Sequence, residues 1–252
     1  MFNLIPNSTI VITGASSGIG REAAIQCAKH GAALLLIGRN WQTLEETAAA
    51  FPENAVYEIL EADLTQSDNI KALLNEKCKL LPPVSGFVSC AGKRSTIPLK
   101  YLDQDELQGT VNTNVIPGFL LAGCLASKKK ISDKGASFVF ISSATAHRGN
   151  PGLISYSASK GALVSGVKSM AAELAPLNIR CNTISPGFVM DTRLTRKEFE
   201  NIPQAAKDEI IKRHPLGLGT TADVAAVVLF LLSEQARWIT GSDIVADGGF
   251  LI

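Results

Sequence analysis

One stretch organises this chain: Ser8-Thr-Ile-Val-Ile-Thr13, followed directly by Gly14-Ala-Ser-Ser-Gly18-Ile-Gly20. The first part is β-branched and uncharged, as a buried parallel strand should be. After the last glycine, apolar residues fall on one helical stripe with Ile19, namely Ala23, Ala24, Cys27 and Ala28. The glycines therefore lie at a strand-to-helix turn, where backbone N–H groups and the positive end of a helix dipole favour an anion. The stretch predicts a nucleotide-phosphate site or, alternatively, an ordinary tight turn.

Strand-like and helix-like runs alternate along the chain, with no repeat, linker or low-complexity segment. The expected strands are residues 8–13, 32–37, 56–60, 84–90, 136–142, 179–184 and 243–246. The expected helices after the first are 41–50 (capped by Asn40), 68–80 (with Ile70, Leu73, Leu74 and Cys78 inward), 156–174 and 222–232. A long helical stretch is expected over 103–130, either as one helix or as a short helix followed by a longer one. Small mobile helices outside the sheet are expected over 188–216. This alternation predicts a single α/β domain over 1–252, a doubly wound parallel sheet of about seven strands with helices on both faces. Ligands bind such sheets at the carboxyl ends of the strands, where the strand order reverses.

Composition narrows the class of protein. Apolar residues make up 46% of the chain and charged residues 19%, which predicts a large core, and a net charge of +1 favours neither a nucleic-acid nor a membrane partner. No apolar run approaches the ~20 residues that span a bilayer, and the first strand begins too early to leave room for a cleaved signal peptide. The five cysteines are odd in number and form no C-x-x-C pair, as expected of free buried thiols in a reducing compartment. We therefore predict a cytoplasmic protein.

The end of the second strand indicates the cofactor. An NAD-binding unit usually places a carboxylate there, to accept from the adenosine ribose hydroxyl. Here Gly38 occupies the position and Arg39 follows it. A guanidinium offers a fixed fork of donors that matches a 2′-phosphate. This predicts NADP(H), the alternative being a solvated loop arginine. The glycine loop itself carries Ser16 and Ser17 rather than a second basic residue.

Tyr156-Ser-Ala-Ser-Lys160 carries the chemistry. Four residues apart on a helix, the phenol and the ammonium project from the same face. A free phenol titrates near ~10, and a neighbouring ammonium favours the phenolate form. Ser143 follows the fifth strand, where its hydroxyl can donate to a carbonyl oxygen that gains negative charge. Ser142 beside it is expected to be structural.

The whole pattern resembles the short-chain dehydrogenase/reductase family. The similarity covers about residues 8–249 and rests on T-G-x-x-x-G-I-G at 13–20, Asp63, Ala91-Gly92, Ser143, Tyr156, Lys160, Asn182, Pro186-Gly187 and the tail Asp247-Gly-Gly. It looks closest to the bacterial 3-oxoacyl-(acyl-carrier-protein) reductases.

The resemblance implies a role for each matching residue. Tyr156 is the general acid in reduction and the base in oxidation, Lys160 supports it and holds the nicotinamide ribose, and Ser143 orients the substrate oxygen. Asn114 fits the family's N-x-x-x-x-F better than Asn112 and is expected to hold a water joining Lys160 to solvent. The cofactor-binding set implied is Gly14, Ser16, Ser17, Gly18, Ile19, Gly20, Arg39, Asn40, Asp63, Leu64, Ala91, Gly92, Tyr156, Lys160, Pro186, Gly187, Val189 and Thr192. No metal is required, and His30, His147 and His214 are expected to be structural or solvated.

Three departures from the family pattern stand out. The usual Asn-Asn-Ala-Gly reads Ser89-Cys90-Ala91-Gly92. The threonine expected five residues after Pro186 is Asp191, and Thr192 follows it. The segment after Gly92 differs from that of the acyl reductases, and its Lys93-Arg94 pair suggests either contact with an anionic substrate or a solvated basic pair.

The expected activity is hydride transfer between NADP(H) and a carbonyl or secondary alcohol, with a 3-oxoacyl thioester preferred as substrate. Two alternatives are an idle NADP-binding sensor or scaffold, and a reductase of sugars, steroids or other small ketones. Segments 93–100, 144–155 and 188–214 should form the pocket, with an apolar wall (Pro151, Leu153, Ile154, Phe188) and a charged rim (Arg193, Arg196, Lys197). The helix 222–232, apolar almost all round, and the apolar tail resemble the family's tetramers, in which these elements pair with a symmetry mate. A helix buried within its own monomer is the alternative.

Overall fold

The computed structural model describes residues 2–66 and 69–252. Its core is a seven-stranded sheet in which all neighbouring strands are parallel, in the order β3-β2-β1-β4-β5-β6-β7. The strands are β1 (Thr9–Thr13), β2 (Ala33–Gly38), β3 (Tyr57–Glu61), β4 (Val84–Ser89), β5 (Ala136–Ile141), β6 (Ile179–Pro186) and β7 (Asp243–Ala246). This is the doubly wound α/β fold that the sequence predicts.

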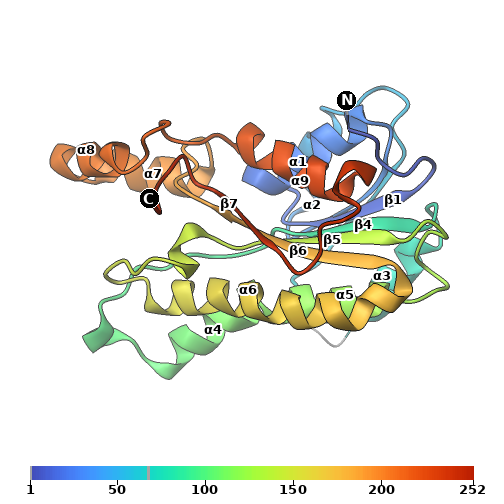
Figure 1. The fold of residues 1–252 in the computed structure, drawn as a ribbon. Helices are drawn as coiled ribbons and strands as arrows, with labels where there is room; N and C mark the ends of the chain where they lie inside the picture. Colours follow the sequence, from blue (N-terminus) through green and yellow to red (C-terminus); the bar gives the residue numbers. More distant parts are fainter. Residues whose placement is uncertain (1, 67–68) are drawn as a thin grey trace.

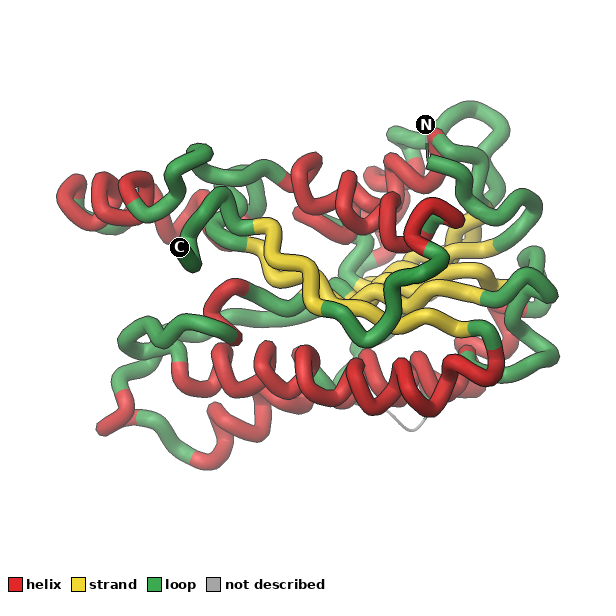
Figure 2. Tube along the Cα trace, viewed as in Figure 1, coloured by secondary structure: helices red, strands yellow, loops and turns green. Residues whose placement is uncertain are grey.

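Helices cover both faces of the sheet (Figures 1 and 2). One layer holds α1 (Gly18–Lys29), α2 (Trp41–Ala48) and α9 (Thr221–Leu232), and the other holds α3 (Ile70–Cys78), α4 (Gln104–Asn114), α5 (Ile116–Leu125) and α6 (Ile154–Leu174). Successive residues of β1 alternate between the two cores, Ile10 and Ile12 on the side of α1 and Val11 on the other, as the pleat of a strand requires.

The strand order reverses between β1 and β4. From β1 the chain winds outward through β2 and β3, then returns to add β4 on the opposite side of β1. The side chain of Thr13 joins the two strands at their carboxyl ends, because its Oγ1 accepts from Cys90 N–H at 3.0 Å and from Ala91 N–H at 3.2 Å. The connections leave these two strand ends in opposite directions, which opens the crevice where ligands bind in folds of this kind.

The expected helical stretch over 103–130 is divided into two helices, the second of the two alternatives, but the helices are of similar length rather than a short one followed by a longer one. α4 ends at Asn114, α5 begins at Ile116, and the last helical residue is Leu125. Pro117 explains the break, because it has no N–H to donate to the carbonyl four residues earlier. The interruption leaves Asn114 at a helix end.

Two smaller expectations need correction. The second and third strands, Ala33–Gly38 and Tyr57–Glu61, each begin and end one residue later than predicted. In α3, Ile70 and Leu74 are buried but Leu73 is 43% exposed, because α3 packs at the β3 edge of the sheet and only one stripe of it meets the core. The predicted start of this helix, residue 68, lies outside the described residues.

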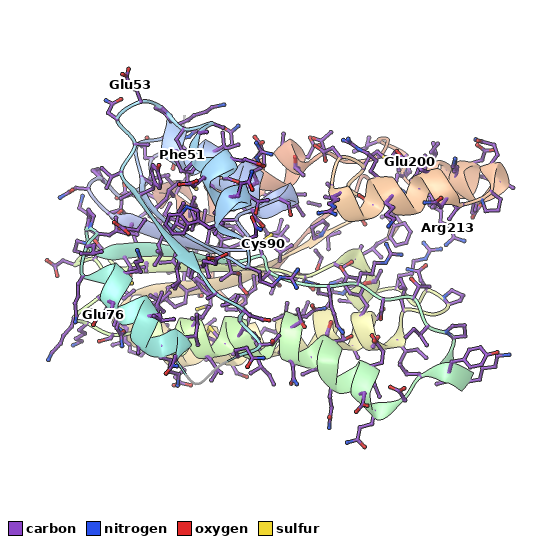
Figure 3. The ribbon with its side chains drawn as sticks, turned by 180° about the vertical axis from the view of Figure 1, so that it is seen from behind. Phe51, Glu53, Glu76, Cys90, Glu200 and Arg213 are labelled. Carbon is purple, nitrogen blue, oxygen red and sulfur yellow. The ribbon has the colours of Figure 1, made fainter. Side chains whose placement is uncertain are left out.

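Two polar helices leave the sheet altogether. α7 (Arg193–Asn201) and α8 (Gln204–Lys212) extend beyond the ends of the strands as an arm (Figure 1). Figure 3 shows Glu200 and Arg213 along this arm and Cys90 close to the ends of the central strands. The structure thus confirms the prediction that residues 188–216 contain small helices outside the sheet.

The five cysteines are free thiols, but only Cys27 and Cys181 are fully buried. Burial raises the pKa of each of these two to about 12. Among the residues described, no helix is both long and apolar enough to cross a membrane. Within the same part of the chain, His, Cys, Asp and Glu side chains do not gather in a group of three or more that could hold a metal ion.

Candidate active site

The glycine loop is built for a close backbone approach. Gly14 has φ +67°, and a Cβ there would lie 2.9 Å from the backbone nitrogen of Ala91. A Cβ on Gly20 would overlap the Gly14 carbonyl group, 2.8 Å from its carbon. Ser17 is the N-cap of α1, yet its side chain makes no capping hydrogen bond. N–H groups in the first turn of α1 therefore point outward without a side-chain cap, and this cradle fits the diphosphate of a dinucleotide.

Arg39 and Asn40 follow β2 and are exposed. Asn40 caps α2 as predicted, because its Oδ1 accepts from Thr43 N–H at 2.9 Å. Asp63 lies nearby, after β3, and its Oδ1 accepts from both the backbone and the hydroxyl of Thr65, at 2.9 and 2.8 Å. These two hydrogen bonds lower the pKa of Asp63, and the charge of Arg39 lowers it further. The structure thus brings Arg39 and Asp63 together at the edge where an adenosine would lie.

Lys160 is the buried cation of the site. Only 5% of it is exposed, and its Nζ donates to the carbonyl of Ile141, at the end of β5, at 2.8 Å. The same nitrogen lies 5.7 Å from the centre of the Tyr156 ring. A Cβ on Gly92 would come within 3.5 Å of it, so the lysine also borders the A-G turn after β4. The Tyr-x-x-x-Lys pair therefore lies at the carboxyl ends of the central strands.

Ser142 and Ser143 have different tasks. Ser142 is structural, as predicted: its Oγ donates to the carbonyl of Lys160 at 2.9 Å and so ties the end of β5 to α6. Ser143 Oγ accepts from the N–H of Thr145 at 3.3 Å and from its hydroxyl at 3.1 Å. Both contacts use Ser143 as an acceptor. Its own hydroxyl hydrogen therefore remains for a substrate oxygen.

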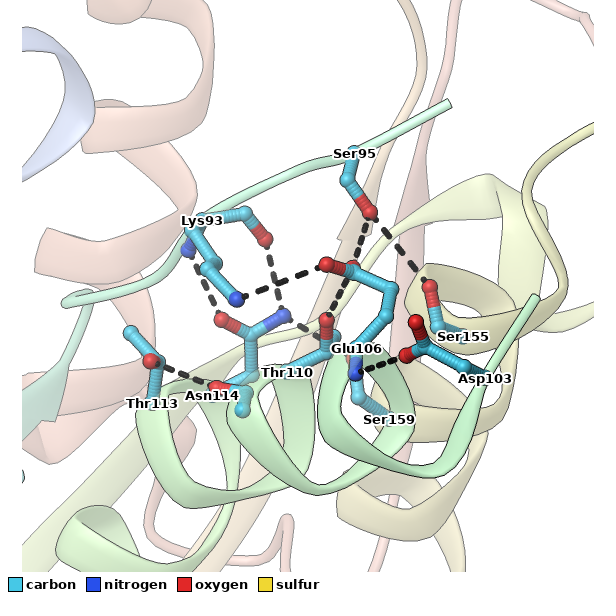
Figure 4. A network of polar contacts seen from close by, with 10 residues as sticks. Lys93, Ser95, Asp103, Glu106, Thr110, Thr113, Asn114, Ser155 and Ser159 are labelled. Carbon is cyan, nitrogen blue, oxygen red and sulfur yellow. Dashed lines mark hydrogen bonds and ion pairs between the residues drawn. The ribbon is translucent and has the colours of Figure 1, made fainter. Parts of the chain in front are cut away.

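Asn114 is held more tightly than the sequence suggests (Figure 4). Its Oδ1 accepts from Lys93 N–H at 2.7 Å, and its Nδ2 donates to the Lys93 carbonyl and to Ser159 Oγ, both at 2.9 Å. Both amide hydrogens are thus committed, so the side chain locks the segment after β4 onto α6. Any water between Asn114 and Lys160 would have to use the remaining lone pair of Oδ1 or the main-chain carbonyl.

A second polar cluster, around Glu106, was not foreseen. Its Oε1 accepts from Thr110 Oγ1 at 2.9 Å and from Ser95 Oγ, which also lies 3.5 Å from Ser155 Oγ (Figure 4). These hydrogen bonds, that from Ser95 first, lower the pKa of Glu106. Lys93 Nζ lies 3.9 Å from Oε2 of the same carboxylate. Lys93 therefore faces Glu106, which favours a structural role over contact with an anionic substrate.

The nicotinamide side of the expected site is formed by the turn after β6. Gly187 packs against the chain after β7, because a Cβ added to Gly187 would lie 2.8 Å from Asp247 Cα. Val189 is buried. Asp191 holds the start of α9, since its carboxylate accepts from the backbone and hydroxyl of Thr221 at 2.7 and 2.8 Å. Thr192 caps α7. The departure at 191–192 thus has a structural reason: each side chain accepts hydrogen bonds at the start of a helix, Asp191 at α9 and Thr192 at α7.

The histidines have structural partners, as expected. His214 is buried, with Nδ1 2.7 Å from the Ile210 carbonyl and Nε2 accepting from Phe188 N–H at 3.1 Å. His30 Nδ1 lies 2.8 Å from the Gln26 carbonyl, within the end of α1. His147 Nε2 lies 2.6 Å from Asp243 Oδ2 and so joins the loop after Ser143 to β7.

The expected apolar wall is formed only in part. Leu153 is 3% exposed and faces the core, whereas Ile154 is 40% exposed. Phe188 packs its ring on Phe199 of α7, 5.7 Å between centroids. The sequence could not show which of these side chains turns inward, because the loops before α6 and α7 carry no periodic pattern.

Comparison with known proteins agrees with this geometry. The family model described as enoyl-(acyl carrier protein) reductase matches residues 14–251. The chain is 31% identical over 246 residues to a 3-oxoacyl-(acyl-carrier-protein) reductase of Thermotoga maritima, covering 96% of this chain and 97% of the relative. It is 30% identical to an L-rhamnose 1-dehydrogenase (NAD(P)(+)) of Azotobacter vinelandii, covering 99% and 98%. The crystal structure of a short-chain type dehydrogenase/reductase from Mycobacterium marinum superimposes with a TM-score of 0.85 at 30% identity, covering 99% and 97%.

Proposed function

Because this chain belongs to the short-chain dehydrogenase/reductase family of oxidoreductases, we propose that it transfers a hydride between NADP(H) and a carbonyl or secondary alcohol. The observation that carries the proposal is the position of Lys160, a buried ammonium between the end of β5 and the ring of Tyr156. A binding protein needs no such pair at its ligand crevice. We further propose a 3-oxoacyl thioester as substrate, which the relative from Thermotoga supports, whereas the rhamnose dehydrogenase favours a sugar.

A nicotinamide coenzyme, when bound in this crevice, would supply or accept the hydride. In reduction, the Tyr156 phenol donates its proton to the substrate oxygen, and in oxidation its phenolate takes the proton back. The Ser143 hydroxyl donates a hydrogen bond to that oxygen as negative charge develops. Lys160 stabilises the phenolate by its charge. Asn114 keeps the turn that carries Gly92 beside Lys160, through its bonds to the Lys93 backbone.

A substrate screen tests the activity. Purified protein would be mixed with NADPH and 3-oxoacyl thioesters, simple ketones, sugars and steroids, with the coenzyme absorbance followed in time. We expect turnover with the thioesters. Turnover of sugars or steroids alone would contradict the acyl assignment. Tight NADPH binding with no turnover across the whole panel would instead favour a sensor or scaffold.

Coenzyme choice is assigned to Arg39. Replacing Arg39 with Asp should invert the preference, since a carboxylate repels a 2′-phosphate and can accept from the ribose hydroxyl of NADH. We expect wild type to bind NADPH at least tenfold more tightly than NADH, a difference of about 1.4 kcal/mol or more. Isothermal titration with both coenzymes measures it. Tighter binding of NADH by wild type would mean that Arg39 interacts only with Asp63 and solvent and does not bind the 2′-phosphate.

We propose a homotetramer, on grounds that overlap in part with those from the sequence: the apolar tail is kept, and exposed side chains near β7 are added. The buried side chains of α9 pack against the sheet and α1 within the chain, while Ala222 and Ala226 are exposed. Three exposed apolar side chains lie in the open edge strand β7 or within six residues of it along the chain: Val245 is 43% exposed, Trp238 97% and Ile252 99%. Light scattering should give four times the 26.7 kDa of one chain. A monomer at micromolar concentration would refute the assembly.

A further inference from the structure

A cleft of about 330 Å³ lies between the glycine loop and α7. Ser17, Gly18 and Arg21 line it from the start of α1, and the facing wall comes from the first turns of α7 and the residue before its cap: Asp191, Arg193, Arg196, Lys197 and Glu200. Four of these side chains are cations and two are carboxylates. One carboxylate, Asp191, is already engaged by Thr221.

The first turn of α7 lies directly above the phosphate cradle. The methyl carbon of Thr192, the N-cap of α7, would be 3.5 Å from a Cβ on Gly18, the first residue of α1. Two helices of nine and twelve residues therefore begin at the same place, and the positive ends of both dipoles meet at the cleft.

The cations that gather there form no ion pair with a carboxylate whose side chain the structure describes. The side chains of residues 194 and 198 lie outside that description, and among the others no ion pair involves Arg21, Arg193, Arg196 or Lys197. The three cations on α7 are exposed, and Arg21 donates to the Glu46 carbonyl at 3.5 Å. Bringing like charges to two helix N-termini is unfavourable unless an anion balances them. A dinucleotide bound at the glycine loop would provide that anion, because its diphosphate would lie at this helix terminus.

We propose that α7 is a second phosphate-binding element, in which Arg193 and Arg196, supported by Lys197 and Arg21, neutralise the diphosphate of the bound dinucleotide. The inference rests on the proposed function, since it presumes that the chain binds a nicotinamide coenzyme. In this arrangement α7 supplies the basic residues that the glycine loop itself lacks. Because α7 also carries Phe199 against Phe188, the same helix links the cofactor phosphates to the substrate side of the site.

The diphosphate is the target, and the 2′-phosphate is not. Arg39 ends β2 and lies near Asp63 after β3, whereas α7 follows β6 on the other side of the β1–β4 junction. The two basic groups therefore approach the crevice from opposite ends of the strand order. Each should affect a different part of the coenzyme.

The test compares R193Q/R196Q with R39Q by isothermal titration of NADPH, NADH and ADP-ribose, which has the diphosphate but neither 2′-phosphate nor nicotinamide. The α7 variant should raise the Kd of all three ligands by the same factor, about tenfold, and should flatten the dependence of Kd on salt. R39Q should weaken NADPH alone. K212Q is the matched control, since Lys212 carries a similar charge on α8 and does not line the cleft; it should change nothing.

The outcomes separate this inference from the proposed function. If wild type binds neither coenzyme, the proposed function fails, and the inference with it. If wild type binds both coenzymes and R193Q/R196Q binds all three ligands as tightly as wild type does, only the proposal that α7 is a second phosphate-binding element is wrong. A loss confined to NADPH would assign the α7 cations to the 2′-phosphate and overturn the proposal. Unchanged dinucleotide binding with weaker binding of an acyl-coenzyme A thioester would assign the cleft to the substrate and overturn it too.

Discussion

Replacing Tyr156 with phenylalanine should lower kcat by about 10²–10⁴-fold, the usual contribution of a positioned general acid. The substitution removes only the hydroxyl, so the ring beside Lys160 stays. The Kd of the coenzyme should therefore remain within about twofold, because the lost interaction belongs to the transition state. Steady-state rates with the best substrate of the screen, together with coenzyme titration, measure both quantities.

Tyr57→Phe is the matched control. Tyr57 is 43% exposed at the first residue of β3, at the end of the sheet opposite the site, and its ring contact with Phe51 survives the substitution. Its kcat should equal that of wild type. Substantial turnover by the Tyr156→Phe variant would place the acid elsewhere. His147, held by Asp243 in the loop after Ser143, would then be the next candidate.

Replacing Gly20 with alanine should damage both coenzyme binding and stability. The added Cβ would overlap backbone atoms of Gly14, and backbone cannot rotate aside as a flexible side chain can. Forcing a methyl group into such a site costs about 1–3 kcal/mol, or more where the chain cannot shift. Separating α1 from the glycine turn would also misplace the N–H groups of the cradle. We expect the free energy of unfolding, measured by urea denaturation, to be lower than that of wild type by this amount. We also expect the Kd of NADPH to rise at least tenfold.

Gly123→Ala gives the comparison. Gly123 is an exposed residue of α5, and a Cβ added there would meet open space, with none of the described neighbours within 4 Å. Alanine there should stabilise the helix by roughly 0.5–1 kcal/mol and leave coenzyme binding unchanged. If Gly20→Ala binds NADPH as tightly as wild type, the glycine loop is not the phosphate cradle. The proposed position of the diphosphate would then be wrong.

Local features of the site were predictable from sequence because they depend on spacing alone. A β-branched run followed by Gly14, Gly18 and Gly20 determines a strand-to-helix turn whatever surrounds it. The spacing of four residues from Tyr156 to Lys160 places both side chains on one helix face. The alternation of strands and helices likewise predicts a parallel sheet, since right-handed crossovers leave few other arrangements.

Contacts between distant segments were decided by the tertiary structure. The bonds of Asn114 to Lys93, of Asp191 to Thr221 and of Glu106 to Ser95 each join segments whose separation carries no periodic signal. The packing of α9 was also decided by the fold. The sequence left open whether a partner subunit or the chain itself buries this helix, and its buried side chains pack within the chain.

The position of α7 shows the difference most clearly. Its sequence, Arg193-Leu-Thr-Arg-Lys197, predicts only a charged rim, because nothing local relates it to a loop 175 residues earlier (Gly18 to Arg193). In the sheet β6 lies two strands beyond β4, and the segment that follows it runs back across the strand ends, so that α7 begins above Gly18. The sequence by itself determined which residues can carry the chemistry, since that depends on side-chain type and short spacing. Only the folded chain decided which charges face the cradle, since that depends on how the strands are ordered in the sheet.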